Sequence, residues 1–235
     1  MASLTVRKNI ENLSPAELQG LRDAYVRAQW IFDNRGYNYY AGFHGIPNWF
    51  CPHHDRSVRS NQNLKLFLPW HRAYLLYFER AIRDLADPNI KFGLPWWDWT
   101  SAASQTFGVP AAFATPSANG RYNPLFQAWI YAPTARPPVS HWTTRFPGNP
   151  RQLPNQQRVE SLLSLSQFSD FSTQLEDIHD FIHGWVGGNN GNLGGDMGNL
   201  GTAAWDPLFW SHHCMIDRIW YVWQIRQGVN NVPLN

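Results

Sequence analysis

The sequence predicts a mainly α-helical fold, in which a four-helix bundle core is joined by long irregular loops with little β structure. Four segments carry apolar residues at helical spacing, and each has recognisable start or stop signals. The stretches between them are rich in proline and glycine. With 235 residues the chain suits one domain, and we expect residues 1–235 to form it.

The first two helices are expected on either side of an irregular stretch. The first runs from about residue 15 to 34, because Ser14, Pro15 and Glu17 form a capped helix start. Residues 35–68 contain several glycines and prolines and are expected to be irregular. The second helix begins near Pro69 and stops before Pro88.

The other two helices are expected in the last third of the chain. Residues 91–158 lack clear periodicity and are predicted to be a long surface excursion, in which the tryptophans at 96, 97 and 99 serve packing. The third helix spans about 169–184, and the glycine-rich residues 187–201 form a loop. The fourth runs from Pro207 to about Gln227, with Asp206 as its N-cap.

Composition excludes several classes of function. The net charge is +2, and the lysines and arginines are scattered, so we expect no nucleic-acid partner. No apolar run approaches the roughly 20 residues of a membrane span, and we expect no membrane partner. The start shows no signal peptide, which favours a cytoplasmic location. Two distant cysteines give no disulfide framework.

Histidine carries the functional signal, because eight of the nine histidines fall into three clusters. His179 and His183 are four residues apart and share a helical face, as metal ligands can, although both could simply pack at a helix end. A zinc-protease site would need glutamate where Asp180 stands.

The other clusters complete three histidines in each half of the chain. His212 and His213 lie on the fourth helix, and the first cluster is His44, His53, His54 and His71. Three imidazoles suit copper or zinc, and two such sites inside a helix bundle would form a binuclear centre. Asp217 and Arg218 would either support that site or only tie helices together.

Three motifs occur in order along the chain. They are Phe67-Leu68-Pro69-Trp70-His71-Arg72, then His179-x3-His183-Gly184-Trp185, and finally Asp206-Pro207-Leu208-Phe209-Trp210-Ser211-His212-His213 continuing to Asp217-Arg218. In these motifs the chain resembles tyrosinases, the type-3 copper oxidase family that also includes catechol oxidases and o-aminophenol oxidases. Molluscan oxygen carriers are relatives of that family. The similarity runs nearly end to end.

The resemblance implies two copper ions. The first would be bound by His44, His53 and His71, with His54 as the alternative to His53, and the second by His179, His183 and His213. His212 and Asp217 would then support the ligands.

One departure from the family concerns the second ligand of the first copper. The family has this ligand nine residues before the third, where this chain has Gln62, so we read residues 55–63 as an insertion. Cys51-Pro52-His53 matches a family pattern in which the cysteine is joined to the histidine by a thioether. Alkylation of Cys51 in every denatured molecule would contradict that link. Cys214 is expected to be a plain buried thiol.

The resemblance also implies an activity on small phenolic substrates. The two copper ions would bind O2 as co-substrate, and the protein would hydroxylate monophenols or oxidise o-diphenols to o-quinones. Glu176 and Asp180 would hold a water that acts as a base, although both could be ordinary solvated helix residues. Leu200 would occupy the gate position over the second copper.

The sequence also leads to expectations about the oligomeric state and activation of the protein, and it leaves alternative functions open. We expect a monomer or dimer, and no shielding domain after the fourth helix, so that activity needs no proteolysis. The alternatives are an o-aminophenol oxidase, a dioxygen carrier, ranked lower, and a zinc hydrolase.

Overall fold

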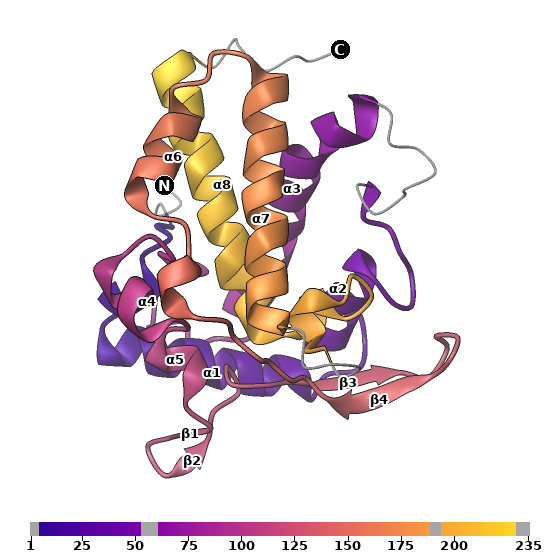
Figure 1. The fold of residues 1–235 in the computed structure, drawn as a ribbon. Helices are drawn as coiled ribbons and strands as arrows, with labels where there is room; N and C mark the ends of the chain where they lie inside the picture. The colour runs from indigo at the N-terminus through magenta and orange to yellow at the C-terminus, as the bar shows by residue number, and fades with distance from the viewer. Residues whose placement is uncertain (1–4, 53–60, 189–193, 229–235) are drawn as a thin grey trace.

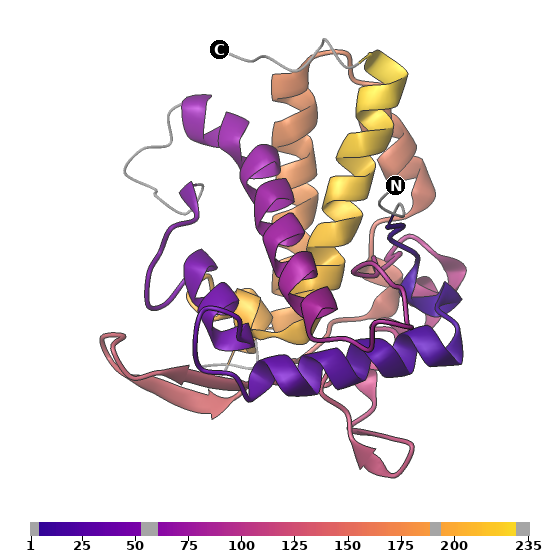
Figure 2. The same ribbon diagram turned by 180° about the vertical axis from the view of Figure 1, so that it is seen from behind.

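Three long helices stand side by side in the core, and a fourth lies across one end of them (Figures 1 and 2). The computed structural model describes residues 5–52, 61–188 and 194–228. The upright helices are α3 (Asn61–Asp84), α7 (Phe168–Gly187) and α8 (Pro207–Gln227), and the crossing helix is α1 (Pro15–Gln29). α3 packs against both α7 and α8. The predicted mainly helical core is confirmed.

α1 begins where the sequence predicts and ends earlier. The Ser14 hydroxyl accepts a hydrogen bond from the Glu17 backbone, and the Glu17 carboxylate accepts one from the Ser14 backbone. The helix ends at Gln29, so the predicted end near residue 34 is wrong. The reason is a turn in which the Gly36 backbone donates to the Asp33 carbonyl and Arg35 pairs with the Asp33 carboxylate.

Residues 35–68 are more helical than expected. α2 (Tyr37–His44) occupies the start of this stretch, directly after Gly36. The Tyr37 ring is fully buried, its hydroxyl donates to the Trp205 carbonyl at 3.0 Å, and the Trp210 indole donates to it at 3.2 Å. Tertiary packing, which local sequence patterns do not report, therefore stabilises this short aromatic helix.

α3 also starts earlier than predicted, at Asn61, which places Pro69 inside the helix. An internal proline costs about 3 kcal/mol. Phe67 and Leu68 are almost fully buried beside it, and each such side chain contributes about 1.5–3 kcal/mol on burial. Their packing offsets the proline, so the proline does not mark the helix start.

The excursion at residues 91–158 is built from short elements and is not irregular throughout. It contains α4 (Ala102–Phe107), α5 (Ala111–Ala114) and the beginning of α6 (Gln156–Leu163). Two antiparallel hairpins supply the strands, β1 (Ser117–Ala118) with β2 (Arg121–Tyr122) and β3 (Trp129–Ala132) with β4 (Val139–Trp142). Trp97 and Trp99 are fully buried, which confirms their packing role.

α7 and α8 match their predictions closely. Asp206 caps α8 by accepting a hydrogen bond from the Leu208 backbone at 2.8 Å. Its carboxylate is completely buried and receives both Nε and Nη2 of Arg145. No helix in the described part of the chain has the length and apolar character needed to cross a membrane.

Candidate metal centre

Four helices bring histidine side chains to one buried place between them. α2 contributes His44, α3 contributes His71, and α7 contributes His179 and His183. α8 contributes His213. Because each helix is fixed by its own packing, the imidazoles converge although they lie up to about 170 residues apart in sequence.

The candidate ligand atoms form two groups that share one histidine. In each group, all ligand atoms lie within 4.8 Å of one another. One group is His44, His71 and His213, and the other is His179, His183, His212 and His213. His213 therefore lies between the two halves of the cluster, where its ring stacks on that of His71 at a centroid distance of 4.3 Å.

Three imidazoles of the second group point the same nitrogen at one another. The Nε2 atom of His213 lies 3.2 Å from Nε2 of His179 and 3.3 Å from Nε2 of His183. A set of nitrogen lone pairs at this separation is repulsive unless a cation or proton lies among them.

The opposite nitrogens are anchored by oxygen acceptors. Nδ1–H of His71 donates to the Phe67 carbonyl at 2.8 Å, and Nδ1–H of His183 donates to the Met197 carbonyl at 2.8 Å. Nδ1–H of His179 donates to the Asp180 carboxylate at 2.9 Å. These acceptors fix the tautomer that leaves Nε2 unprotonated and ready to bind a metal ion. The residues present thus fit a metal centre with imidazole ligands.

Burial keeps the imidazoles of His212 and His213 in the neutral form. Desolvation, followed by repulsion from the neighbouring imidazoles, holds the pKa of His213 well below its usual 6.5. Desolvation and the nearby His183 lower the pKa of His212 in the same way. Since a metal ion does not have to displace protons from neutral ligands, metal binding at neutral pH is favoured.

The first half of the centre is described only in part. His53 and His54 lie outside the described residues, so the choice between them stays a prediction. Cys51, two residues before His53, is buried and its Sγ lies 3.7 Å from Nε2 of His71. The chain thus passes beside the cluster just before the predicted ligand.

Glu176 and Asp180 occupy one face of α7, as their spacing of four residues requires. The Glu176 side chain is half-buried. The Asp180 side chain is 60% exposed and accepts the hydrogen bond from His179. Asp180 therefore orients a predicted ligand. The water-holding role expected from the sequence stays a prediction.

Leu200 lies on the loop that joins α7 to α8. It is 41% exposed. Three residues before it, the Met197 carbonyl accepts from His183, and directly after it the Gly201 carbonyl accepts from the Ile46 backbone, two residues beyond His44. The loop therefore borders both halves of the histidine cluster.

Of the two residues expected to support the ligands, His212 contacts a candidate ligand and Asp217 contacts arginines instead. His212 is fully buried and stacks on His179 at 5.3 Å. Asp217 pairs with Arg7 at 2.9 Å and with Arg72, so it ties α3, α8 and the N-terminal segment together. The interpretation of Asp217 as a link between helices is the one that the structure bears out.

Sequence reasoning missed the backbone acceptors at Phe67 and Met197. The first could have been found, since a carbonyl four residues before a helical histidine lies within reach of its Nδ1. The second comes from a loop and carries no sequence signal.

Comparison with known proteins places these features in a family. Residues 34–226 match the family model described as the common central domain of tyrosinase. Hemocyanin units G and H of Sepia officinalis are 33% identical over 98% of this chain. Unit G of the hemocyanin beta-C chain of Helix pomatia is 32% identical over 100% of it. The chain spans 39% and 55% of the length of these two curated relatives.

Solved structures give the same picture. A functional unit of octopus hemocyanin is 29% identical with a TM-score of 0.76, over 98% of this chain and 56% of that one. The tyrosinase of Burkholderia thailandensis at high pH is 22% identical with a TM-score of 0.78, over 96% of this chain and 62% of that one. The likeness to the bacterial enzyme concerns the fold alone.

Proposed function

Because this chain belongs to the tyrosinase family of type-3 copper proteins, we propose that it is a copper-dependent oxidase of small phenolic compounds. Its reaction is the hydroxylation of monophenols, the oxidation of o-diphenols to o-quinones, or both, with O2 as oxidant. The supporting observation is that His183, unlike the other four described ligand candidates, is partly exposed to solvent. The solvent contact of His183 marks the side from which we propose that a ring substrate approaches the centre, an approach that a protein that only carries O2 does not need.

In this proposal the first copper is held by His44, His53 and His71, and the second by His179, His183 and His213. Two bound copper ions would supply the binding of O2 and the oxidation of the substrate. The anchored Nδ1 atoms of His71, His179 and His183 keep these three rings in place, so that they do not have to reorganise during the reaction.

Glu176 and Asp180 are proposed to move the substrate proton. A phenol has to lose its hydroxyl proton before it is oxidised, and a water held between two carboxylates can accept it. Glu176 is suited to this role because it is half-buried and lies three residues before His179 on α7. Asp180 would hold the water with its second oxygen, since its first accepts from His179.

Leu200 is proposed to control the entry of the ring. A leucine side chain leaves more room than phenylalanine, so Leu200→Phe should lower kcat/KM for a catechol several-fold while copper content stays at the wild-type value. Unchanged kinetics in this variant would place the entrance elsewhere.

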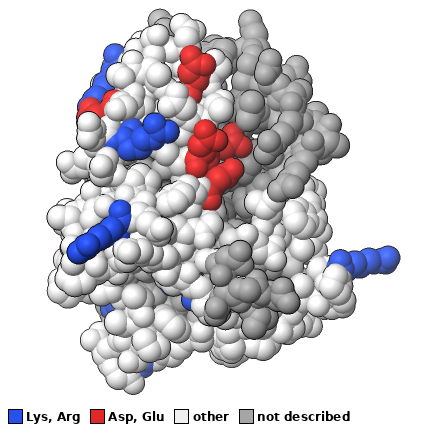
Figure 3. Space-filling view, viewed as in Figure 1, with Lys and Arg blue, Asp and Glu red and all other residues white. Residues whose placement is uncertain are grey.

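The proposed substrate is neutral and small. On the face shown in Figure 3, lysines and arginines are scattered singly and form no patch, while a few acidic side chains gather near its centre. We propose no nucleic-acid partner, and a monomeric or dimeric state.

Reversible O2 carriage is the second candidate function. It is favoured by the relatives named hemocyanin, which are 32–33% identical to this chain. A carrier would bind O2 in the same dicopper centre and would not turn over a phenol. The two functions differ in whether a ring can enter, and not in the ligand set.

Oxygen uptake by the copper-loaded protein separates the two functions. The protein is offered a phenol, the matching catechol and an o-aminophenol in turn. Uptake with any of them supports the oxidase, and the pattern tells the classes of oxidase apart. Reversible O2 binding with no uptake on any substrate would overturn the oxidase proposal in favour of the carrier.

A matched pair of histidine variants tests the ligand set. His213→Gln should lose copper and turnover together, because His213 belongs to both groups of imidazoles. His141→Gln is the control, since His141 is half-exposed on β4 and pairs with Asp196 outside the cluster. Full copper content in His213→Gln would refute the assignment of the ligands.

A further inference from the structure

One pocket of the structure includes none of the cluster histidines and is lined mainly by aromatic side chains. It has a volume of about 600 Å³, within the range of roughly 300–1,000 Å³ that small-molecule sites occupy. Its aromatic residues come from the end of α1, the segment after it and the two hairpins: Trp30, Phe32, Tyr122, Trp129, Tyr131 and Trp142. None of these residues is among the predicted copper ligands.

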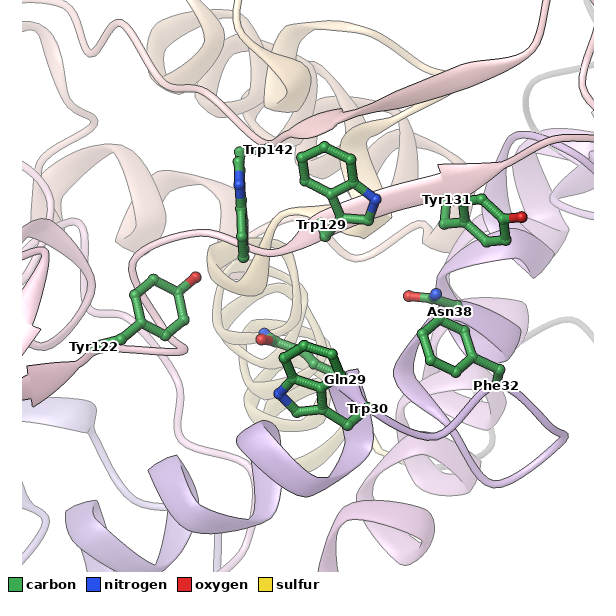
Figure 4. Close-up of a pocket in the computed structure, with 8 residues that line it drawn as sticks. All are labelled: Gln29, Trp30, Phe32, Asn38, Tyr122, Trp129, Tyr131 and Trp142. Carbon is green, nitrogen blue, oxygen red and sulfur yellow. The ribbon is translucent and has the colours of Figure 1, made fainter.

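The rings form two facing rows. Figure 4 shows Trp30 and Phe32 on one side and Trp129, Tyr131 and Trp142 on the other. The hairpin register sets the second row, because Trp129 lies directly opposite Trp142 and their rings meet edge to face at 5.3 Å. The pairing of β3 with β4 therefore fixes the relative positions of Trp129 and Trp142 in the pocket wall.

Several of these rings are exposed to water, which is unfavourable in free energy for apolar surface. Trp30 is 76% exposed and Phe32 is 66% exposed. Covering such faces would gain about 25 cal/mol for each Å² removed from water, and a group of exposed aromatics is characteristic of a binding site.

The lining carries no full charge, which restricts the ligand. Among the described residues that line the pocket there is no Asp, Glu, Lys or Arg. A charged ligand would lose water without gaining an opposite charge, whereas a neutral ligand would not pay this penalty. The ligand is therefore expected to be uncharged.

Polar groups lie at the edges and base of the pocket. Gln29 and Asn38 lie between the two rows of rings (Figure 4). The Gln29 amide already donates to the Pro124 carbonyl at 2.9 Å. Among the hydrogen bonds of the described side chains, none uses the Asn38 amide or the indole N–H groups of Trp129 and Trp142. These lining groups therefore have hydrogen-bonding capacity left for the hydroxyls of a ligand.

From these features we propose that this pocket binds a neutral ring with apolar faces and hydroxyl groups around its edge. Saccharides and polyhydroxylated phenols share this chemistry. The site is separate from the copper centre, so the proposal stands independently of the oxidase function.

Calorimetric titration of the copper-loaded protein without oxygen tests the proposal. The two probes are cellotetraose, for the saccharide, and phloroglucinol, a phenol with no neighbouring hydroxyls. We expect saturable binding of at least one probe, and the probe that binds more tightly identifies the source of the ring.

Three variants locate the binding. Trp30→Ala removes a highly exposed ring and should weaken binding about tenfold, the size expected for a lost aromatic contact. Asn38→Leu removes the amide at similar volume and should also weaken binding. Phe107→Ala is the control, because Phe107 is 81% exposed and lies outside the pocket.

Two outcomes would overturn the proposal. One is that neither probe binds, or that binding is the same in the Trp30 and Asn38 variants as in the wild type. The other is a dimer that Trp30→Ala dissociates while neither probe binds, which would make this face an interface between two copies of the chain.

Discussion

The buried ion pair at the start of α8 allows a quantitative prediction about stability. Arg145→Met removes the guanidinium that gives three hydrogen bonds of 2.6–2.9 Å to Asp206 and also donates to the carbonyls of Phe113 and Leu125. Asp206 is 0% exposed, so its carboxylate would stay buried without a cation. Removing one partner of such a pair costs about 3–5 kcal/mol. We expect a loss of this size in the free energy of unfolding at pH 7.

The same variant should show a characteristic pH dependence. Burial raises the pKa of Asp206, and the nearby Arg145 opposes this rise. Without Arg145 the folded-state pKa moves higher, while the unfolded value stays near 3.8. The folded state then holds a proton that the unfolded state has lost, so stability falls as pH rises between those two values. The deficit of Arg145→Met should therefore be smaller at pH 5 than at pH 7.

Urea denaturation at both pH values measures this deficit. Arg226→Met is the control, because Arg226 and Glu160 form an exposed pair that should contribute little to stability. A deficit of Arg145→Met equal to that of the control, or one that does not change with pH, would refute the reasoning.

Two further predictions concern the centre itself. In the folded protein the pKa values of His212 and His213 are held well below 6.5, so below that pH the unfolded chain binds more protons than the folded one. The copper-free protein should therefore lose up to about 1.4 kcal/mol of stability for each histidine with each unit that the pH falls below 6.5. Denaturation at pH 7.5, 6.5 and 5.5 measures this slope, and a stability that does not change with pH contradicts it. Gly187→Ala should weaken copper binding, because the new Cβ would lie 2.3 Å from the Gly198 backbone nitrogen. The clash would push away the loop in which the Met197 carbonyl, next to Gly198, accepts the hydrogen bond of His183. Gly184→Ala on the same helix meets nothing within 4 Å and should leave copper binding unchanged, while raising stability through higher helix propensity.

The parts of the fold that the sequence predicts well are those governed by local signals. The capped start at Ser14 and the N-cap Asp206 are correct because the capping side chain and its backbone partner are close in sequence. α7 is correct because its apolar residues repeat at helical spacing and face a continuous core.

The elements that were missed depend on distant contacts. α2 is a helix because Tyr37 is buried against a segment more than 160 residues away. α3 continues through Pro69 because neighbouring side chains pack in the core. Neither contact has a trace in the local pattern, where glycine and proline point to a break.

For the candidate site, residue identities were easier to predict than their geometry. Spacing on one helix face brings His179 and His183 together. That His213 would stand between the two groups follows only from how α8 packs against α3. The aromatic pocket gave no signal, because its rings are scattered over more than 110 residues that meet only in the folded chain.

The position of His213 explains why so much of the buried polar chemistry surrounds α8. A shift of this helix along its axis would move His213 relative to both His71 and His179 at once. Asp206 is held by Arg145 about two turns before His213, and Asp217 is held by two arginines about one turn after it. A helix fixed at both sides of a shared ligand has little freedom to slide. Loosening either anchor should therefore disturb both halves of the metal centre together, and a variant of one anchor that lost a single copper would show that the two halves are held separately.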